Sequence, residues 1–246
     1  MKQLKIILLL FPLLFSSCNN EDAWDIFKTA GEQITEERDI EPFNKLEMLD
    51  RINVILVQDT LERLTISGPK NLLPKVSTLV KNGCLIIKDT NRFNWVRSYD
   101  HEITATVHVQ TLNHIYYEGI GDITSANQLV VDSLTIISQE SAGDIWLNIN
   151  VHYFYCYFNK SLVYMNLSGN AHRAHLQING TGFLHCEGLL TSTCSVQNQG
   201  SGDITANCTN YFSGIIEGSG NILFTGNPNQ RVFVYKGRGS GQFIEF

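Results

Sequence analysis

The sequence QGSGDI, at residues 199–204, returns with small changes five more times in the second half of the chain. The last glycine of each copy is at position 121, 143, 182, 202, 220 or 241, at intervals of 22, 39, 20, 18 and 21 residues. The longest interval holds a degenerate copy at residues 159–162. Seven units of about twenty residues follow, a period typical of a solenoid whose turns cannot bury their apolar faces alone.

The glycines and acidic residues of the motif suit a corner of the chain. Glycine takes positive φ without steric penalty, and in the degenerate copy we expect Asn159 to replace it. The Asp or Asn that follows suits an Asx-type turn closing the corner onto the backbone. The predicted corner residues are Gly119, Gly121, Asp122, Gly143, Asp144, Gly180, Gly182, Gly200, Gly202, Asp203, Gly218, Gly220, Asn221, Gly239 and Gly241.

Apolar residues follow the corners at every second position, as in Ile145, Leu147 and Ile149. Such alternation is typical of strands with one buried face. About twenty residues per turn suit three short strands and their corners. The turns lack the helical spacing of a leucine-rich repeat, whereas a β-propeller of paired units stays an alternative. The sequence therefore predicts an all-β protein, a single-stranded β-helix (β-solenoid) of about seven turns.

The first half of the chain is less regular and is predicted as strands that lead into the solenoid and cap one end of it. Helix formers over residues 24–37 indicate a short helix or a tether, and residues 71–80 one helical turn. Gly68-Pro69 and Asn82-Gly83 indicate turns. The predicted strands are 45–48, 53–58, 63–67, 84–88 and 102–109. The folded domain, residues 40–246, thus has N-terminal strands over 40–115 and repeat turns over 116–246.

The first eighteen residues have the pattern of a lipoprotein signal. Lys2 and Lys5 precede an apolar run over residues 6–15, shorter than the roughly 20 residues that span a bilayer. Small residues then lead to Cys18, as in the bacterial lipobox, although Phe15 departs from the usual Leu. We expect residues 1–17 to be removed and residues 18–39 to form a tether, lipidated at Cys18. An ordinary signal peptide is the alternative.

Charge and cysteine content exclude several classes of partner. Loss of Lys2 and Lys5 leaves 16 basic and 24 acidic side chains, so the mature charge is 16 − 24 = −8. This balance disfavours nucleic acid as a partner. Five of the six cysteines remain besides Cys18, an odd number without a CxxC motif. That pattern argues against a zinc site and a disulfide framework and favours buried free thiols.

Carboxylates near the first corners could gather in space. If the turns stack, Glu118, Asp122, Glu140 and Asp144 could form a hard-oxygen site for a cation such as Ca²⁺. The carboxylates soon disappear from the equivalent positions of later turns, however. We therefore favour a solvated acidic edge with neither a metal nor a cofactor.

Outward-facing aromatic residues form the candidate binding face. Tyr153, Tyr155 and Tyr157 alternate along one strand, with Trp146 and Tyr164 on neighbouring turns. Aromatic rings among polar residues suit stacking against sugars or contact with a protein. In the alternative parity the three tyrosines are buried and the residues between them face out. Because this strand is apolar on both sides, another element or a second subunit of a homodimer is expected to cover it.

The chain resembles the lipoprotein family described as "putative autotransporter adhesin, head GIN domain". Besides the repeated corners, the matching features are Arg38-Asp39-Ile40 with Phe43, the strand 52–58, and Asn82-Gly83-Cys84-Leu85 before a strand. The match spans residues 38–243. The resemblance implies a right-handed β-helix and a role in adhesion. The family has no established catalytic residues, so none is carried over.

We therefore expect a non-enzymatic surface lipoprotein of the outer membrane that acts in adhesion or binds a glycan or protein. A polysaccharide lyase or hydrolase and a periplasmic scaffold are the alternatives. A lyase typically needs a basic residue beside its acidic cluster, and none of the five basic residues of the repeat half has motif spacing beside it. A hydrolase needs two carboxyl groups about 5 to 9.5 Å apart, a spacing that stacked repeats produce without catalytic demand.

Overall fold

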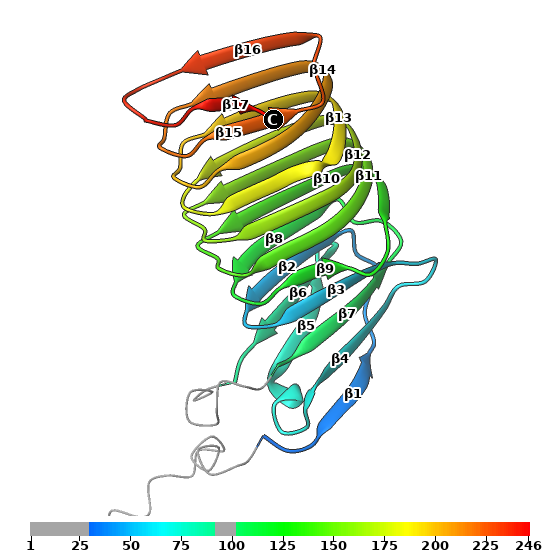
Figure 1. Ribbon diagram of the computed structural model, residues 1–246. Helices are drawn as coiled ribbons and strands as arrows, with labels where there is room; N and C mark the ends of the chain where they lie inside the picture. Colours follow the sequence, from blue (N-terminus) through cyan, green and yellow to red (C-terminus); the bar gives the residue numbers. More distant parts are fainter. Residues whose placement is uncertain (1–29, 92–101) are drawn as a thin grey trace, which may run out of the picture.

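The computed structural model describes residues 30–91 and 102–246 (Figure 1). The predicted signal peptide, Cys18 and the first part of the tether lie outside these residues. The described residues form strands and one 3₁₀ turn, η3 (Leu73–Lys75), and none of their helices could cross a bilayer. The strands are β1 (Gln33–Arg38), β2 (Lys45–Asp50), β3 (Asn53–Gln58), β4 (Arg63–Pro69), β5 (Val76–Lys81), β6 (Cys84–Asp89), β7 (Thr104–Val109), β8 (His114–Gly119), β9 (Ile123–Ser125), β10 (Leu129–Gln139), β11 (Asp144–Asn159), β12 (Tyr164–Asn179), β13 (Phe183–Asn198), β14 (Ile204–Ile216), β15 (Ile222–Thr225), β16 (Gln230–Tyr235) and β17 (Phe243–Glu245).

The strands form a flattened stack of turns with two facing layers (Figure 1). We name the layer of segments that lead into the glycine corners the incoming sheet; it includes β8 and the second half of β11. The outgoing sheet holds the segments that leave the corners, including β9 and the first half of β11. Neighbouring turns pair in parallel. Seven corners separate the segments from β8 to β17, so the predicted all-β solenoid of about seven turns is confirmed.

Each regular turn has two strand segments instead of the three short strands expected. β11, β12 and β13 have 16 residues each and run from the outgoing sheet to the incoming sheet without interruption. The register shifts between Asn166 and Ser168 in β12, and between Cys186 and Leu190 in β13. Such irregularities bend a strand without ending it. The change of sheet itself comes where two successive residues face outward, His152 and Tyr153 in β11 and His172 and Arg173 in β12.

Four of the N-terminal strands are layers of the stack itself. β2 pairs in parallel with both β6 and β8, and β3 with both β7 and β9. The turn β2–β3 therefore lies between β6–β7 and β8–β9, although it comes first in the sequence. Among the described strands, the antiparallel pairs involve β1, β4 and β5. Only these three strands act as the predicted cap.

Two segments with predicted helical character, residues 24–37 and 71–80, are partly strands. Residues 33–38 form β1, which pairs with β4 along its whole length. Sheet pairing overrides the helical preference of Glu36 and Glu37 there. In the segment 71–80 the helical turn is limited to η3, and β5 follows. β5 and β6 form a hairpin whose turn, Asn82-Gly83, has φ of 53° and 70°, as predicted. Gly68-Pro69, predicted as a turn, instead ends β4.

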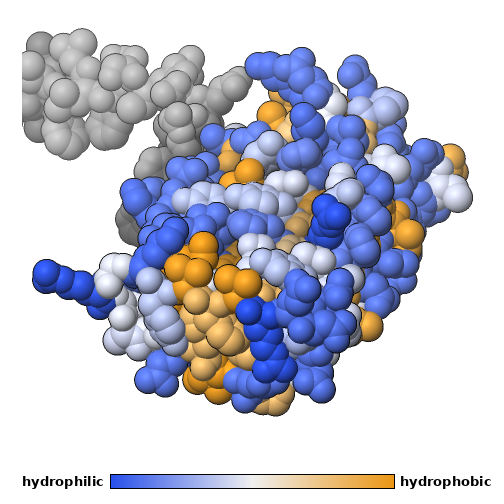
Figure 2. All heavy atoms as spheres, turned by 90° about the horizontal axis from the view of Figure 1, so that it is seen from above, coloured by the Kyte–Doolittle hydropathy of each residue, from blue (hydrophilic) through white to orange (hydrophobic). Residues whose placement is uncertain are grey.

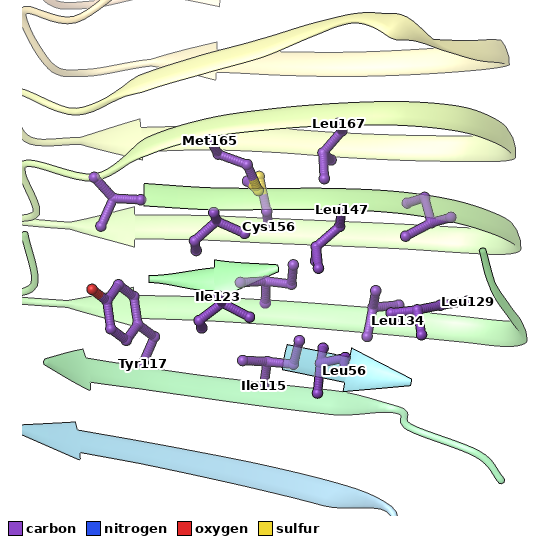
Figure 3. Close-up of a cluster of buried hydrophobic side chains, with 14 of the residues drawn as sticks. Leu56, Ile115, Tyr117, Ile123, Leu129, Leu134, Leu147, Cys156, Met165 and Leu167 are labelled. Atoms are coloured by element: carbon purple, nitrogen blue, oxygen red, sulfur yellow. The ribbon is translucent and has the colours of Figure 1, made fainter. Parts of the chain in front are cut away.

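The core fills the space between the two sheets along the stack. Figure 3 shows apolar side chains from both sheets pointing into this space, among them Leu147 from the outgoing sheet and Cys156 from the incoming sheet. Ile145, Leu147 and Ile149 are buried, and Trp146 between them is exposed. The predicted parity of the strands is therefore correct. Each turn buries its inward residues against the turns above and below, as expected for a solenoid.

The corner glycines are required by close packing of the turns. None of those predicted to take positive φ does so, and in two corners the left-handed residues are Glu140 and Lys160. A Cβ atom on Gly121 would lie 2.1 Å from the carbonyl oxygen of Ile52, and one on Gly202 only 1.7 Å from that of Gly182. Backbones stacked this closely exclude any side chain.

The acidic corner residues connect turns instead of closing their own. The Oδ1 atom of Asn53 accepts a hydrogen bond from the backbone N–H of Asp122 at 2.9 Å. Asp122 Oδ1 in turn accepts one from the N–H of Asp144 at 2.9 Å. Asp203 accepts one in the same way from Asn221 at 2.7 Å. The predicted Asx turns are thus replaced by a ladder in which each side chain accepts from the equivalent residue of the next turn.

Candidate binding surfaces

The five aromatic residues of the candidate binding face lie on two different sheets. Trp146 and Tyr164 are on the outgoing sheet, in β11 and β12. Tyr153, Tyr155 and Tyr157 are in the half of β11 that belongs to the incoming sheet. Their outward orientation is correct, because the residues between the three tyrosines are buried. Because β11 bends from one sheet to the other, the predicted face is divided into two candidate surfaces, one on each sheet.

The outgoing sheet carries an aromatic strip, formed by Trp146, Tyr164, Phe183 and His185. The ring centroids are 5.7 Å apart for Trp146 and Tyr164, 4.6 Å for Tyr164 and His185, and 6.4 Å for His185 and Phe183. Trp146 is 46% exposed and Phe183 43%. The strip crosses three consecutive turns and offers its rings to solvent.

Hydrogen-bonding side chains border the aromatic strip. Asn148 Oδ1 accepts a hydrogen bond from Gln128 at 3.0 Å, which orients its amide. Nδ1 of His185 lies 3.8 Å from a carboxylate oxygen of Glu187, and the other oxygen of Glu187 accepts from the hydroxyl of Thr205. Aromatic platforms beside planar polar groups suit a ligand that has both C–H faces and hydroxyl groups.

Two members of this strip, Phe183 and His185, are not among the aromatic residues predicted from the sequence. Phe183 pairs with Tyr164, and His185 with Asn166, which itself pairs with Trp146. Both missed residues follow the corner at residues 179–182 with outward parity. Aligning outward positions between turns, in place of searching one strand for tyrosines, would have found them.

The incoming sheet carries a second surface with a hollow of about 540 Å³. Lys45, Glu47, Tyr116 and Glu118 line it, from β2 and β8. The hollow between β2 and β8 has both basic and acidic lining residues, Lys45 beside Glu47 and Glu118, so it has no preference for a ligand of one charge sign.

Further along this sheet, Tyr155 stacks on His175 with centroids 5.2 Å apart. Burial lowers the pKa of His175, a shift that a hydrogen bond with Gln177 partly offsets.

At the bend, the rings stack between turns. His152 stacks on His172 with centroids 4.7 Å apart, and the guanidinium of Arg173 lies 5.8 Å from the ring centre of Tyr153. These contacts join residues of β11 and β12 on the edge opposite the glycine corners. They stiffen the bend and leave the broad faces of the two sheets open.

The four carboxylates considered for Ca²⁺ do not converge. Asp122 and Asp144 belong to the ladder, Glu118 lines the hollow, and Glu140 pairs with Lys160 at 3.6 Å. Over residues 30–91 and 102–246, no group of three or more His, Cys, Asp or Glu side chains could hold a metal ion. The four carboxylates therefore make separate contacts and form no common cluster in the described part of the chain.

An acid–histidine pair lies at the N-terminal end of the outgoing sheet, beside β3 and β7. Asp59 Oδ2 is 3.0 Å from Nδ1 of His108, and this hydrogen bond holds the pKa of Asp59 below its usual value. Arg63 lies 3.3 Å from the other ring nitrogen of His108. The hydroxyl of Thr60 is near Asp59, at 3.4 Å, and not beside the imidazole. A nucleophile activated by histidine needs contact with the ring, so this arrangement is a hydrogen-bonded cluster on the surface.

The five described cysteines are free thiols. Cys84 is half-buried and the other four are buried. Burial raises the pKa of Cys156 to about 12 and raises that of Cys186 and Cys194 as well. Burial, followed by the charge of Glu47, also raises the pKa of Cys84. Thiolates are the reactive form of cysteine, so the folded protein should react slowly.

A thiol assay tests this assignment. In a Cys18→Ser variant at neutral pH, we expect an aromatic disulfide reagent to label Cys84 alone, and slowly, in the native state. In denaturant all five thiols should react at once. Labelling of two or more thiols in the native protein would contradict the burial described above, and a Cys84→Ser variant identifies the residue that reacts.

Comparison with known proteins agrees with this architecture. The model of the family described as "Putative auto-transporter adhesin, head GIN domain" matches residues 42–228. The chain belongs to this family. No curated protein matches the chain by sequence. The resemblance read from the repeated corners is therefore confirmed at the level of the family.

Solved structures share the fold of this head GIN family member. A crystal structure titled "putative adhesin" from Bacteroides fragilis has a TM-score of 0.79 and 25% identity, covering 87% of this chain and 97% of its own. A "putative adhesin" from Parabacteroides merdae has a TM-score of 0.64 and 18% identity, covering 89% and 98%. A "putative lipid binding protein" from Parabacteroides distasonis has a TM-score of 0.66 and 18% identity, covering 87% and 97%. These likenesses extend over nearly the whole length of those chains.

Proposed function

We propose that the protein is a lipoprotein of the cell envelope, anchored through Cys18, that binds neutral glycans with the aromatic strip of its outgoing sheet. Membership of the adhesin-like family supports a binding role. The lipobox pattern at Cys18 supports the anchor, and display on the cell surface would let the protein act in adhesion. The aromatic strip is the observation that carries the choice of ligand.

Sugar rings suit the aromatic strip for a physical reason. Adjacent turns of a β-solenoid are about 4.8 Å apart, so the strip offers a new ring at each step of a chain laid along the stack. Pyranose C–H faces stack on such rings, and border residues such as Asn148 and Asn166 can hydrogen-bond the hydroxyl groups. Asp144 and Glu187 beside the strip disfavour an anionic polysaccharide.

The same residues give less support to a hydrolase or lyase. Asp122 and Asp144 accept or donate hydrogen bonds in the ladder between turns. A general acid needs a raised pKa and a position beside the scissile bond, whereas these carboxylates are exposed at a corner. A binding protein needs only a rigid surface, which the stacked sheets provide.

Paired double variants test the binding proposal. We expect Trp146→Ala with Phe183→Ala to weaken binding to a neutral oligosaccharide, first identified on a glycan array, by about tenfold or more, because each ring contributes roughly 0.5–1.5 kcal/mol of stacking. The matched control is Tyr116→Ala with Tyr153→Ala, which removes two rings of similar exposure from the incoming sheet. Loss of binding in the control alone, or no glycan binding by the natural protein, would refute the proposal.

Surface proteolysis tests the location separately. On intact cells, we expect an added protease to cleave a surface-displayed lipoprotein, while a periplasmic marker stays intact. Cleavage only after lysis would favour a periplasmic scaffold. A Cys18→Ser variant should leave the membrane fraction in either case, so the anchor and the side of the membrane are read independently.

A further inference from the structure

The two ends of the stack are built differently. At the N-terminal end, β1 is the outermost strand of one sheet, and its sequence, QITEER, ends in three charged residues. Charged side chains on an edge strand oppose pairing with another chain. At the C-terminal end, β16 pairs only with β14, and β17 only with β15, among the described strands. The outer edges of β16 and β17 therefore present unpaired backbone N–H and C=O groups.

The open end is also apolar. Figure 2 looks down onto it and shows an apolar patch at its centre. Five of the fifteen large hydrophobic residues that are exposed in the described chain belong to the last fifteen residues. They are Val232 (41%), Phe233 (42%), Tyr235 (63%), Ile244 (38%) and Phe246 (59%). Natural edge strands are normally protected by charges, prolines or bulges, and residues 232–235 have none of these protections.

The edge of β16 is complementary to itself. Arg231, Phe233 and Tyr235 have inward parity, because they pair with Phe212, Gly214 and Ile216 of β14. In an antiparallel pair centred on Phe233, this residue meets its own copy, and Arg231 lies opposite Tyr235 of the second copy at both ends. On the outer side, Val232 lies opposite Val234 of the second copy. Aromatic pairs and an Arg over an aromatic ring are favourable cross-strand neighbours.

An ion pair between Arg231 and Glu245 neutralises the charges at this end. Arg231 and Glu245 are both on inward positions of the last turn, with N–O distance 2.6 Å. The guanidinium also lies 5.5 Å from the ring centre of Phe224. Glu245 is therefore neutralised within its own chain. Covering the end therefore leaves neither of these two charges unpaired.

We propose that two copies of this chain associate end to end through their C-terminal turns, with β16 pairing antiparallel to β16 of the second copy. A two-fold axis normal to the sheets continues both layers across the junction, so β17 is covered together with β16. An unrelated extended peptide on β16 would leave Ile244 and Phe246 exposed. A two-fold contact uses the same surface on both copies, so association stops at the dimer.

The size of the end limits the strength of this dimer. Strand segments of about six residues span roughly 20 Å. The two sheets lie about 10 Å apart, and with their outer side chains the end is roughly 20 Å thick. The end face therefore measures on the order of 400 Å² per copy. This is about half of a standard interface. We therefore expect a dissociation constant in the micromolar range, with backbone pairing as its main specific feature.

Site-directed crosslinking tests the two-fold pairing. In the full lipoprotein solubilised in detergent, at tens of micromolar, we expect Phe233→Cys to give a disulfide-linked dimer under mild oxidation, because residue 233 meets its own copy at the axis. The control is Val130→Cys, an exposed apolar position at the bend. At least tenfold more dimer from Phe233→Cys supports the proposal, and equal yields overturn it.

A charge variant separates the interface from the fold. Val232→Lys with Tyr235→Lys places two cations on the exposed edge. By sedimentation, we expect the natural protein to reach a dimer as its concentration rises and this variant to stay monomeric with an unchanged circular dichroism melt. A natural protein that stays monomeric at about 100 µM overturns the proposal. A dimer that persists in the variant does so too, because the interface must then lie elsewhere.

Discussion

Replacing Gly202 with alanine is expected to lower the free energy of unfolding by about 4 kcal/mol or more, the upper range for a single substitution. A Cβ atom at this position would lie 1.7 Å from the carbonyl oxygen of Gly182 and 2.7 Å from its carbonyl carbon. Both are backbone atoms, so no rotamer change relieves the contact. The corners must move apart, and the strand pairs on both sides of them must lose hydrogen bonds.

Urea unfolding followed by circular dichroism measures this effect. Ser201→Ala is the matched control, because Ser201 is an exposed residue of the same corner and its substitution should change stability by less than about 0.5 kcal/mol. Gly188→Ala should be intermediate, since its Cβ would lie 3.0 Å from the Leu167 carbonyl oxygen. Equal stability of Gly202→Ala and Ser201→Ala would show that the corners are not in contact.

The repeat period made most of this fold predictable. A twenty-residue spacing and alternating apolar positions require stacked turns whatever the details of the corners, and residues such as Ile145 are buried as expected. The role of the corner glycines was not predictable in the same way. Positive φ is a local property of one residue, whereas the contact of Gly202 with Gly182 exists only after two distant segments stack.

Contacts between distant segments also explain why the order of the N-terminal strands and the two separate aromatic surfaces were not predicted. β2 and β3 lack the glycine motif, so nothing in the sequence shows that they lie between β6–β7 and β8–β9. The aromatic residues were identified with the correct outward orientation, but the bend in β11 assigned them to different sheets. The bend lies where His152 and Tyr153 both face outward, and the apolar alternation of one strand does not show which sheet each half of it joins.

Replacing the buried Asn198 with leucine is expected to destabilise the protein by about 3–5 kcal/mol. Asn198 is fully buried and pairs with Ile178 and Ile216, so it occupies an apolar position of the core. Its Nδ2 donates to the carbonyl oxygens of Gly202 at 2.8 Å and Asn221 at 3.1 Å. Its Oδ1 accepts from the N–H of Gly200 at 3.0 Å.

The size of this effect follows from the backbone groups that leucine would leave unpaired. Each buried donor or acceptor without a partner costs about 1–3 kcal/mol, which outweighs the gain from burying a leucine side chain. In the first regular corner, Tyr117 has the same role, and its hydroxyl donates to the carbonyl oxygen of Gly121 at 2.7 Å. Two unrelated side chains thus satisfy equivalent carbonyls, which indicates that these corners require an internal donor.

Denaturant unfolding of Asn198→Leu beside Asn150→Leu distinguishes this role from a general effect of the substitution. Asn150 is exposed on β11, so leucine there should change the free energy of unfolding by less than about 0.5 kcal/mol. Hydrogen exchange should also speed up at the N–H of Gly200, whose acceptor is lost, and remain slow in β8 and β9. If Asn198→Leu is as stable as the natural protein, the corner at residues 199–204 does not depend on an internal donor, and leucine packs there like its neighbours Ile178 and Ile216.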